Sequence, residues 1–261
     1  MQQNSTDTTF TYTFPNGQIA YVLDVPDSLS YAESITALGL TKPTPSMVVI
    51  GGASKMSNES RRRVSQVFTR VLAPFAQTHN ITVFDGGTDA GVIQMMGQAR
   101  HHVGGTFNLV GIAPKAKISL PGYFPYSNGD TENKDLITLE KNHTHFALIP
   151  GITWGSESPW LAHCASKVAN NFPSITILIN GGKISLSDLT LNLSVGRQAI
   201  IIAGSGRLAD EIANTISGTI PYDDSIQKLA AIYYPSQISI FKLSNSLDNL
   251  TKQLKSHFNK R

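Results

Sequence analysis

The sequence lacks several features that mark particular classes of protein. It contains one cysteine, Cys164, which excludes an intrachain disulfide and a cysteine-based zinc site. Its longest purely apolar runs, such as Ala199–Ala203, are far shorter than the ~18 residues of a membrane-spanning helix. The opening residues are polar and resemble no secretory signal. We therefore expect a soluble cytoplasmic protein with no membrane partner.

Charge is also scarce, at 15% of residues against roughly 25% in an average soluble domain. The formal net charge is +3, but four basic residues lie in the last ten positions, and the rest of the chain holds 17 basic and 18 acidic residues. A basic surface for nucleic acid is therefore not expected. Few charges suit a protein whose central strands are covered on both faces.

Short apolar runs recur along the chain, each followed by a glycine-rich break and an amphipathic segment. The runs are Met47–Ile50, Ile81–Phe84, Leu109–Ala113, Phe146–Ile149, Ile175–Ile179 and Ala199–Ala203. Continuous apolar character is typical of parallel strands buried on both faces. The segments between them repeat apolar residues at helical spacing. We predict an α/β fold with a Rossmann-like, doubly wound, mostly parallel sheet of about six or seven strands and helices on both faces.

The two flanks of this pattern are predicted to be additions to a single domain. Residues 1–45 form an N-terminal extension with a short hairpin and a helix over 28–38, packed on the core. The core itself is expected over 46–218. A C-terminal helical extension occupies 219–261, with helices over 225–234 and 247–258 and a strand over 238–243.

Glycine is concentrated in the loops that follow the strands, whereas proline and asparagine mark the loops that enter them. Ligands of open α/β sheets bind at the carboxyl ends of the strands. The alternative is that tight turns need glycine for positive φ whether or not a ligand is present. Five of the six predicted strand ends carry paired or near-paired glycines, which favours a binding site.

Three loops could carry this site. Residues 85–92 follow a strand and open a helix, with Thr88 as the expected N-cap and free amides that suit a phosphate or a carboxylate. Residues 204–209 match G-x-G-x-x-A and place Arg207 beside a glycine turn; the alternative is a solvated arginine. Residues 150–159 contain Glu157 before the expected N-cap Ser158, where it could accept hydrogen bonds from sugar hydroxyls or simply support the helix.

Other polar groups give weaker signals. A metal site on the histidine pairs at 101–102 and 143–145 would need carboxylate partners that the sequence does not place, so no metal site is predicted. The arginines at 61–63 are expected on a solvated helix face. No P-loop, zinc-protease motif or Ser-His-Asp order is present.

Six motifs occur in order: GGTDAGV (86–92), GIAP (111–114), NHTHF (142–146), GSE (155–157), INGG (179–182) and GSGRLAD (204–210). This series resembles the SLOG superfamily, and within it the LSDAT group of prokaryotic proteins and the cytosolic N-terminal region of melastatin-type TRP channels. The resemblance covers residues 47–213. It implies a Rossmann-like fold that binds a nucleotide-derived small molecule such as ADP-ribose or cyclic ADP-ribose, with no separate cofactor.

Together the pattern and the resemblance give one set of expected ligand-binding residues. They are Gly51, Gly52, Ala53, Gly86, Gly87, Thr88, Gly91, Gly155, Ser156, Glu157, Gly181, Gly182, Gly204, Ser205, Gly206 and Arg207. Glu157 matches the family's G-x-E and is the candidate catalytic residue. Phosphoribohydrolase relatives read P-G-G-x-G-T-x-x-E, whereas this chain places its glutamate one residue early and lacks the arginine paired with that motif.

Two functions from different classes follow. The first is a module that binds or senses an ADP-ribose-like nucleotide, with its pyrophosphate on the turns at 86–88 and 204–207. The second is an enzyme that cleaves an N-glycosidic bond, with Glu157 stabilising the positive charge that develops on the ribose. A third, structural interpretation is an oligomerising scaffold. In each case a homodimer or higher homo-oligomer is expected.

Overall fold

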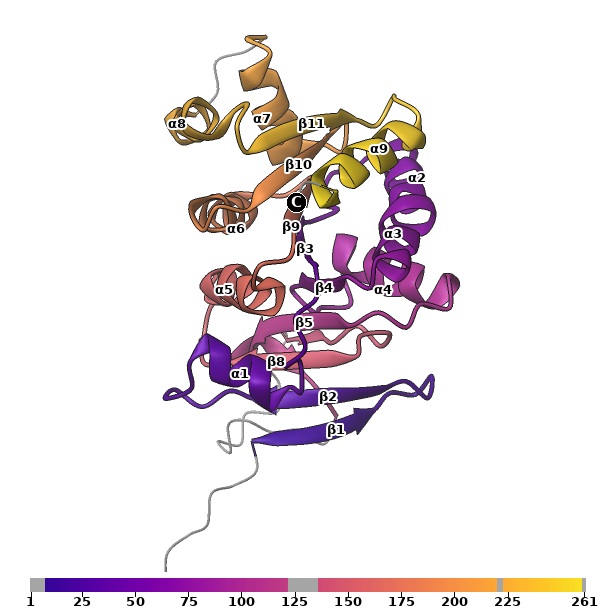
Figure 1. Ribbon diagram of the computed structural model, residues 1–261, viewed down its shortest axis with the longest axis vertical. Coiled ribbons are helices and arrows are strands. Elements are labelled where there is room, and N and C mark those ends of the chain that lie inside the picture. The colour runs from indigo at the N-terminus through magenta and orange to yellow at the C-terminus, as the bar shows by residue number, and fades with distance from the viewer. Residues whose placement is uncertain (1–7, 122–135, 220–222, 260–261) are drawn as a thin grey trace, which may run out of the picture.

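The computed structural model describes residues 8–121, 136–219 and 223–259. Within these ranges nine strands form one sheet, in the order β1-β2-β8-β5-β4-β3-β9-β10-β11 (Figure 1). Every neighbouring pair in it is parallel except β1 with β2. The strands are β1 Thr9–Thr13, β2 Ile19–Asp24, β3 Ser46–Gly51, β4 Thr82–Asp85, β5 Leu109–Pro114, β8 His145–Ile149, β9 Ser174–Ile179, β10 Gln198–Ala203 and β11 Ile238–Lys242.

The sheet confirms the predicted Rossmann-like architecture but is wider than six or seven strands. Both flanks of the chain join it: β2 pairs in parallel with β8, and β11 pairs in parallel with β10. Leu23 of β2 and Phe241 of β11 are fully buried, like residues of the central strands. The sequence pattern understates the width because it places these two strands in the flanking extensions and does not reveal that they pair with the core strands.

Helices cover both faces of the sheet (Figure 1). One face carries α1 Tyr31–Ala37, α5 Ser158–Ala169, α6 Lys183–Ser194, α7 Arg207–Ile216 and α8 Asp224–Tyr233. The other carries α2 Asn58–Val67, α3 Ala73–Thr78, α4 Gly91–His102 and α9 Leu247–Phe258, with a π-helical turn Phe68–Leu72 between α2 and α3. A 3₁₀ turn at Lys115–Lys117 and a small two-stranded sheet of β6 Ile118–Ser119 and β7 Ile137–Thr138 complete the described elements.

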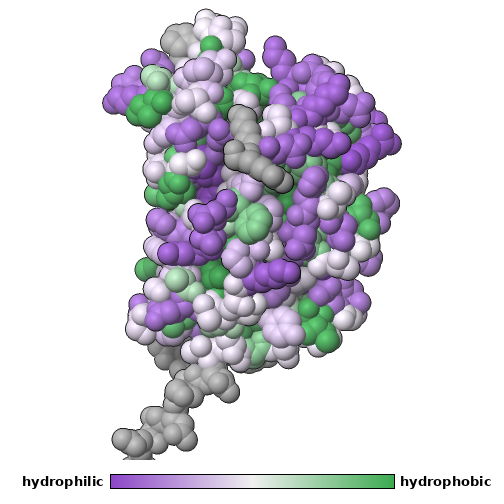
Figure 2. Space-filling model, in the orientation of Figure 1, coloured by the Kyte–Doolittle hydropathy of each residue, from purple (hydrophilic) through white to green (hydrophobic). Residues whose placement is uncertain are grey.

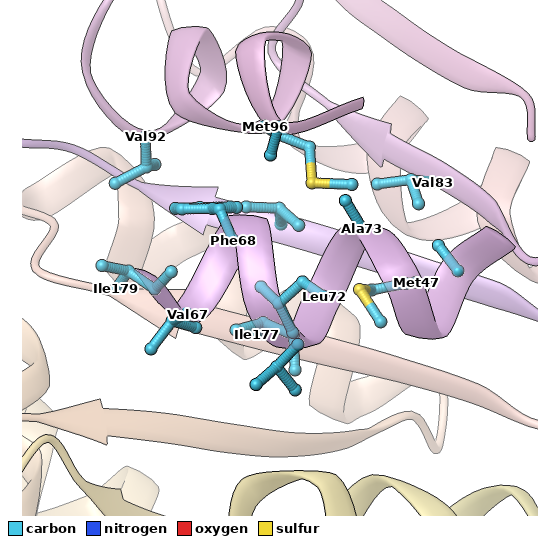
Figure 3. Close-up of a cluster of buried hydrophobic side chains, with 14 of the residues drawn as sticks. Met47, Val67, Phe68, Leu72, Ala73, Val83, Val92, Met96, Ile177 and Ile179 are labelled. Atoms are coloured by element: carbon cyan, nitrogen blue, oxygen red, sulfur yellow. The ribbon is translucent and has the colours of Figure 1, made fainter. Parts of the chain in front are cut away.

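The core lies on both sides of the sheet because side chains alternate along each strand. In β3, Met47 and Val49 point into one layer, while Val48 and Ile50 point into the other. Figure 3 shows the first layer, where Phe68 from the π-helical turn packs beside Val92 and Met96 of α4 and strand residues such as Ile179. These two layers fix the strand ends on which the candidate site is built.

Two helix starts differ from the sequence prediction. The N-cap of α4 is Ala90 and not Thr88, which instead forms a β-bridge with Leu139. The N-cap of α5 is Glu157 and not Ser158, which is already the first helical residue. Thr88 and Ser158 are residue types that favour the N-cap position, but neither occupies it here. Backbone pairing at Thr88 and burial at Ser158 override the local preference.

No helix in the described residues is both long and apolar enough to cross a bilayer. On the face of the molecule in Figure 2, hydrophobic residues are scattered among hydrophilic ones.

Candidate functional site

The sheet changes its direction of winding at β3. From β3 the chain proceeds outward through β4, β5 and β8, and it then returns to β9 on the other side of β3. Such a switch point leaves a crevice outside the carboxyl ends of the two central strands, where open α/β sheets bind ligands. A cleft of about 560 Å³ lies there. It is lined by Gly51 and Gly52 after β3 and by Gly181 and Gly182 after β9.

The glycine at the end of β3 lets the two central strands approach closely. Gly51 has a φ of 135°, which L-amino acids with side chains rarely adopt. A Cβ at this position would lie 1.8 Å from the Ile179 carbonyl oxygen. The fold of the cleft wall therefore requires glycine at position 51, whether or not a ligand contacts it.

One end of the cleft is cationic. Arg207, the first residue of α7, and Lys183, the first residue of α6, both line it. The Arg207 guanidinium lies against Gly182, where a Cβ would come within 2.6 Å of Nη2. No carboxylate of the described residues is within ion-pair distance of Arg207.

The N-terminus of α6 adds partial positive charge at this end. Its N-cap is Gly182, which offers no side chain to cap the helix, and the N–H groups of residues 183–185 have no hydrogen-bond acceptor within the described chain. The N-terminus of a helix with free amides attracts anions. This end of the cleft can therefore hold a phosphate or a carboxylate.

The opposite side of the cleft is acidic. Glu157, 6% exposed, accepts a hydrogen bond from the Gly155 amide at 2.7 Å, and burial raises the pKa of its carboxyl. Asp188 of α6 is also 6% exposed. Burial raises the pKa of Asp188 to about 7; the nearby Ser158 hydroxyl opposes this shift and the charge of Glu157 adds to it. Two nearly buried carboxyl groups thus line the same cleft.

A buried ionic network supports the loop after β4. His143 lies between Asp85 and Glu140, with each ring nitrogen 2.9 Å from a carboxylate oxygen. Asp85 Oδ1 also accepts the Gly87 N–H at 2.8 Å. Arg100, on α4, donates to the Asn142 carbonyl at 3.1 Å, so a second cation lies beside the network. Through the Asp85 carboxylate, the network holds the backbone of residues 85–87 in place.

Eight of the sixteen predicted ligand-binding residues line the cleft. They are Gly51, Gly52, Gly86, Thr88, Glu157, Gly181, Gly182 and Arg207. Gly155 and Gly91 lie just behind it: a Cβ on Gly155 would touch Ile184, and one on Gly91 would touch the amide of Ala53. Ser156 donates its hydroxyl hydrogen to the Thr153 carbonyl at 2.8 Å.

The glycine turn before α7 does not present free amides, contrary to the sequence prediction. The N–H groups of Gly204 and Gly206 both donate to the carboxylate of Asp210, at 2.6 and 3.1 Å. Ser205 is 1% exposed, and its hydroxyl accepts the Asn180 amide N–H at 2.7 Å. The Gly204 and Gly206 amides are therefore paired within the protein. Of residues 204–207, only Arg207 lines the cleft.

Gly87 likewise serves the fold. A Cβ on it would lie 2.9 Å from the Cα of Gly111, so the two strand ends meet backbone to backbone. Its amide is held by Asp85, as described above. Its neighbours Gly86 and Thr88, by contrast, line the cleft.

Four of the nine cleft-lining residues that sequence reasoning missed lie on α6. Lys183, Ile184, Ser185 and Asp188 line the cleft, together with Trp154 from the loop after β8. A signal was present: Ser185, Asp188 and Asn192 follow each other at helical spacing and are all buried. A polar stripe on the buried face of a helix indicates either a polar network or a site.

A larger cavity of about 700 Å³ lies at the opposite, amino-terminal end of the strands. Arg197 lines this cavity and is 4% exposed. Its guanidinium donates hydrogen bonds to Ser174, Asn192, Ala162 and Ser166. Because most of these donors are used within the protein, Arg197 ties β9, α5 and α6 together. The cleft at the switch point is the better candidate, since Arg207 has no carboxylate of the described residues within ion-pair distance and the first amides of α6 are free.

Known proteins resemble this chain over most of its length. A family model described as SLOG in TRPM, prokaryote, matches residues 44–251. Two relatives are transient receptor potential cation channel subfamily M member 2 of Mus musculus and of Rattus norvegicus, each 26% identical, over 264 and 249 residues. The alignments cover 88% and 83% of this chain but 17% and 16% of the channels, so the chain spans about a sixth of their length.

A solved structure shares the fold. The X-ray structure of TM1055, a Northeast Structural Genomics Consortium target, matches with a TM-score of 0.51 and 16% sequence identity, and the match covers 81% of this chain and 99% of that one. The likeness supports the Rossmann-like architecture that the sheet order shows. Because the family model matches residues 44–251, the protein belongs to the prokaryotic LSDAT family, the SLOG domain related to that of TRPM channels.

Proposed function

We propose that the protein binds, as a sensor module, a nucleotide-derived ligand of the ADP-ribose or cyclic ADP-ribose type. Membership of the SLOG family supports a nucleotide-related module. The observation that carries the proposal is the polarity of the cleft at the switch point. It has free cations and helix amides at one end, and buried carboxyl groups at the other. A phosphorylated sugar has the complementary pattern of one anionic end and one end that carries hydroxyl groups.

In this proposal the pyrophosphate lies at the N-terminus of α6. The free amides of residues 183–185 and the Lys183 and Arg207 side chains supply the donors there. Gly52, Gly86 and Gly182 allow the ligand to approach the backbone closely. Glu157 accepts hydrogen bonds from the ribose, and the ring of Trp154 offers a surface on which a base can stack.

Hydrolysis of an N-glycosidic bond is the second candidate function, and one observation favours it. Glu157 and Asp188 share a buried environment in which burial raises the pKa of both carboxyl groups, as in sites that use a carboxylate and a carboxylic acid together. One group would stabilise the positive charge on the ribose and the other would supply a proton to the leaving base, while a water molecule adds to the anomeric carbon in place of the base.

Two measurements test these functions. Isothermal titration calorimetry and thermal unfolding with ADP-ribose, NAD and AMP report binding, and chromatography of the same mixtures reports a released base. Binding without release supports the sensor, and release supports the hydrolase. If no nucleotide binds or raises the melting temperature, the scaffold interpretation is favoured instead.

The cellular setting belongs to the same proposal. We infer a cytoplasmic protein that acts as a homodimer or higher homo-oligomer, in line with the expectation from the sequence. Light scattering on the purified protein measures the assembly, and a monomer at all concentrations would contradict that part.

A further inference from the structure

Asp188 is a buried carboxyl group whose hydrogen bonding is incomplete. The side chain lines the cleft although the residue is only 6% exposed. Its Oδ1 atom has no partner at hydrogen-bond geometry within the described residues, and neither has the hydroxyl of the neighbouring Ser158, which is 1% exposed, although that hydroxyl lies near enough to lower the pKa of Asp188. Buried polar atoms are almost always hydrogen-bonded, and an exception at the wall of a cleft suggests a ligand group as the missing partner.

The charges around Asp188 limit what that ligand group can be. The charged side chains that line the cleft with it are Glu157 at the start of α5, Lys183 at the start of α6 and Arg207 at the start of α7. Of these, Glu157 lies close enough to raise the pKa of Asp188, in addition to the larger effect of burial. Two neighbouring carboxyl groups that are both nearly buried avoid mutual repulsion when one of them holds a proton.

We propose that Glu157 and Asp188 form a sugar-hydroxyl subsite that accepts the unmodified vicinal diol of a ribose and rejects a ribose phosphorylated on its 2′ oxygen. This inference rests on the proposed nucleotide binding and specifies one part of the same cleft. A carboxylate accepts a hydrogen bond and a carboxylic acid donates one. A hydroxyl group both donates and accepts, so a diol satisfies the pair.

Two modifications of the ribose would be unfavourable in this subsite. Loss of the 2′-hydroxyl leaves buried carboxyl oxygens without partners, which costs about a factor of ten in affinity. A 2′-phosphate places a second anion against the carboxylate pair and weakens binding more strongly, by roughly a hundredfold. Lys183 and Arg207 cannot compensate for this, because the 5′-phosphate already engages them in the proposed complex.

The first experiment compares ligands that contain a single sugar. Calorimetry on the intact protein uses AMP, 2′-deoxy-AMP and adenosine 2′,5′-bisphosphate. We expect AMP to bind about tenfold more tightly than the deoxy analogue and about a hundredfold more tightly than the bisphosphate. Equal affinities for AMP and 2′-deoxy-AMP, or tighter binding of the bisphosphate, would overturn the inference.

The second experiment tests the shared proton with Asp188→Asn, which keeps the shape of the side chain and always has an N–H to donate. ADP-ribose is the probe because its two phosphates keep the same charge between about pH 6 and pH 8.5. The wild-type protein should lose about thirtyfold in affinity over this range as Asp188 becomes charged, because the binding-competent fraction falls. The affinity of Asp188→Asn should stay nearly constant.

Two further variants complete the design. Asp248→Asn removes an exposed carboxyl group on α9 and should behave like the wild type. Asp188→Ala should lose the preference for AMP over 2′-deoxy-AMP, and circular dichroism checks that it folds. A purely structural Asp188 would instead give an Asn variant with the wild-type pH profile, which would overturn the inference.

The outcomes also separate this inference from the proposed function. If neither ADP-ribose nor AMP binds the wild-type protein, the nucleotide proposal itself fails, and the subsite with it. If ADP-ribose binds but AMP does not, nucleotide binding stands and the subsite is wrong. The same holds if the affinity changes neither with the 2′ substituent nor with pH.

Discussion

Arg207 combines two unfavourable features at one residue. Its φ of 49° lies in the left-handed region, and its positive charge sits at the positive end of the α7 dipole. Both cost stability in the free protein, and a bound anion would reverse the sign of the second. Strain of this kind concentrates at functional sites.

Replacement of Arg207 by alanine is therefore expected to leave the unliganded fold about as stable as the wild type. The affinity for ADP-ribose should fall by about 1.5–3 kcal/mol, the usual range for a hydrogen bond to a charged group. Thermal unfolding without ligand and calorimetry with ligand measure the two effects. The exposed Arg62→Ala on α2 is the matched control, and it should change neither quantity. An Arg207 variant that unfolds early but binds normally would assign this residue to the fold alone.

His143 is expected to be an imidazolium at neutral pH. Burial by itself would lower its pKa, but the carboxylates of Asp85 and Glu140 outweigh burial and raise it to about 9. An unfolded histidine has a pKa of about 6.5, so the charged form stabilises the fold fully below that value and loses this effect as the pH rises through the folded pKa. The free energy of unfolding should therefore decrease between about pH 7.5 and pH 8.5.

Urea unfolding at several pH values measures this decrease, with His143→Gln as the comparison. The variant is expected to be less stable at pH 7.5 and to show a flatter dependence on pH. Nuclear magnetic resonance of the imidazole ring provides a check that does not need the variant to fold. A neutral His143 ring at pH 7 in the wild-type protein would refute the charged network.

The sequence allowed about half of the cleft-lining candidates to be found, and the reason is physical. Gly51, Gly86 and Gly182 are visible because glycines gathered at several strand ends exceed what tight turns alone require. The helical spacing of Ser185, Asp188 and Asn192 does not by itself single out Asp188, because an acid in the middle of a helix is ordinarily solvated. Asp210 is missed for a related reason: its capping of the Gly204 and Gly206 amides depends on tertiary geometry that no spacing rule encodes.

At the scale of the elements, the junction between β3 and β9 determines the shape of the cleft. Gly51→Ala would place a Cβ 1.8 Å from the Ile179 carbonyl oxygen, and backbone atoms cannot move aside cheaply. We expect a loss of about 3 kcal/mol or more in the free energy of unfolding, and a large fall in the melting temperature.

The neighbouring Gly52 offers a matched comparison. A Cβ there would have its nearest contact at 4.0 Å, with the Asn180 side chain, and Gly52 does not have a positive φ. Gly52→Ala should therefore retain nearly wild-type stability in the same thermal scan. If Gly51→Ala and Gly52→Ala have the same melting temperature, close packing at Gly51 does not hold the two strands in place.

Element types were easier to predict than their ends. The helix expected over 247–258 is α9 as observed, because it combines the N-cap Ser246 with a regular apolar stripe. The helix expected over 28–38 is shorter, since Ser30 forms a capping box with Glu33 and starts α1 at Tyr31. The N-caps predicted at Thr88 and Ser158 were wrong. Thr88 forms a β-bridge instead, and Ser158 is buried.

At the scale of the whole molecule, the two flanks of the chain are parts of one sheet. β2 pairs with β8, and Leu23 and Val25 are buried in the same layer as Leu161 of α5. On the other edge, Phe241 of β11 and Leu250 of α9 join the layer that contains Phe68. We propose that residues 1–45 and 219–261 belong to one domain with the core and unfold together with it.

Differential scanning calorimetry tests this proposal through the ratio of van't Hoff to calorimetric enthalpy, which should be close to one for a single cooperative unit. Two separate transitions, or a stable fragment of residues 46–218 after limited proteolysis, would show that the flanks are independent of the core.

The central claim is that the cleft between the ends of β3 and β9 holds a phosphorylated nucleotide. The most direct measurement is a crystal structure of the protein with saturating ADP-ribose. We expect density for the two phosphates against the first turn of α6, within hydrogen-bond distance of Arg207, and for a ribose beside Glu157 and Asp188. Crystals with an empty cleft, or with the nucleotide in the cavity beside Arg197 at the opposite end of the sheet, would contradict the account.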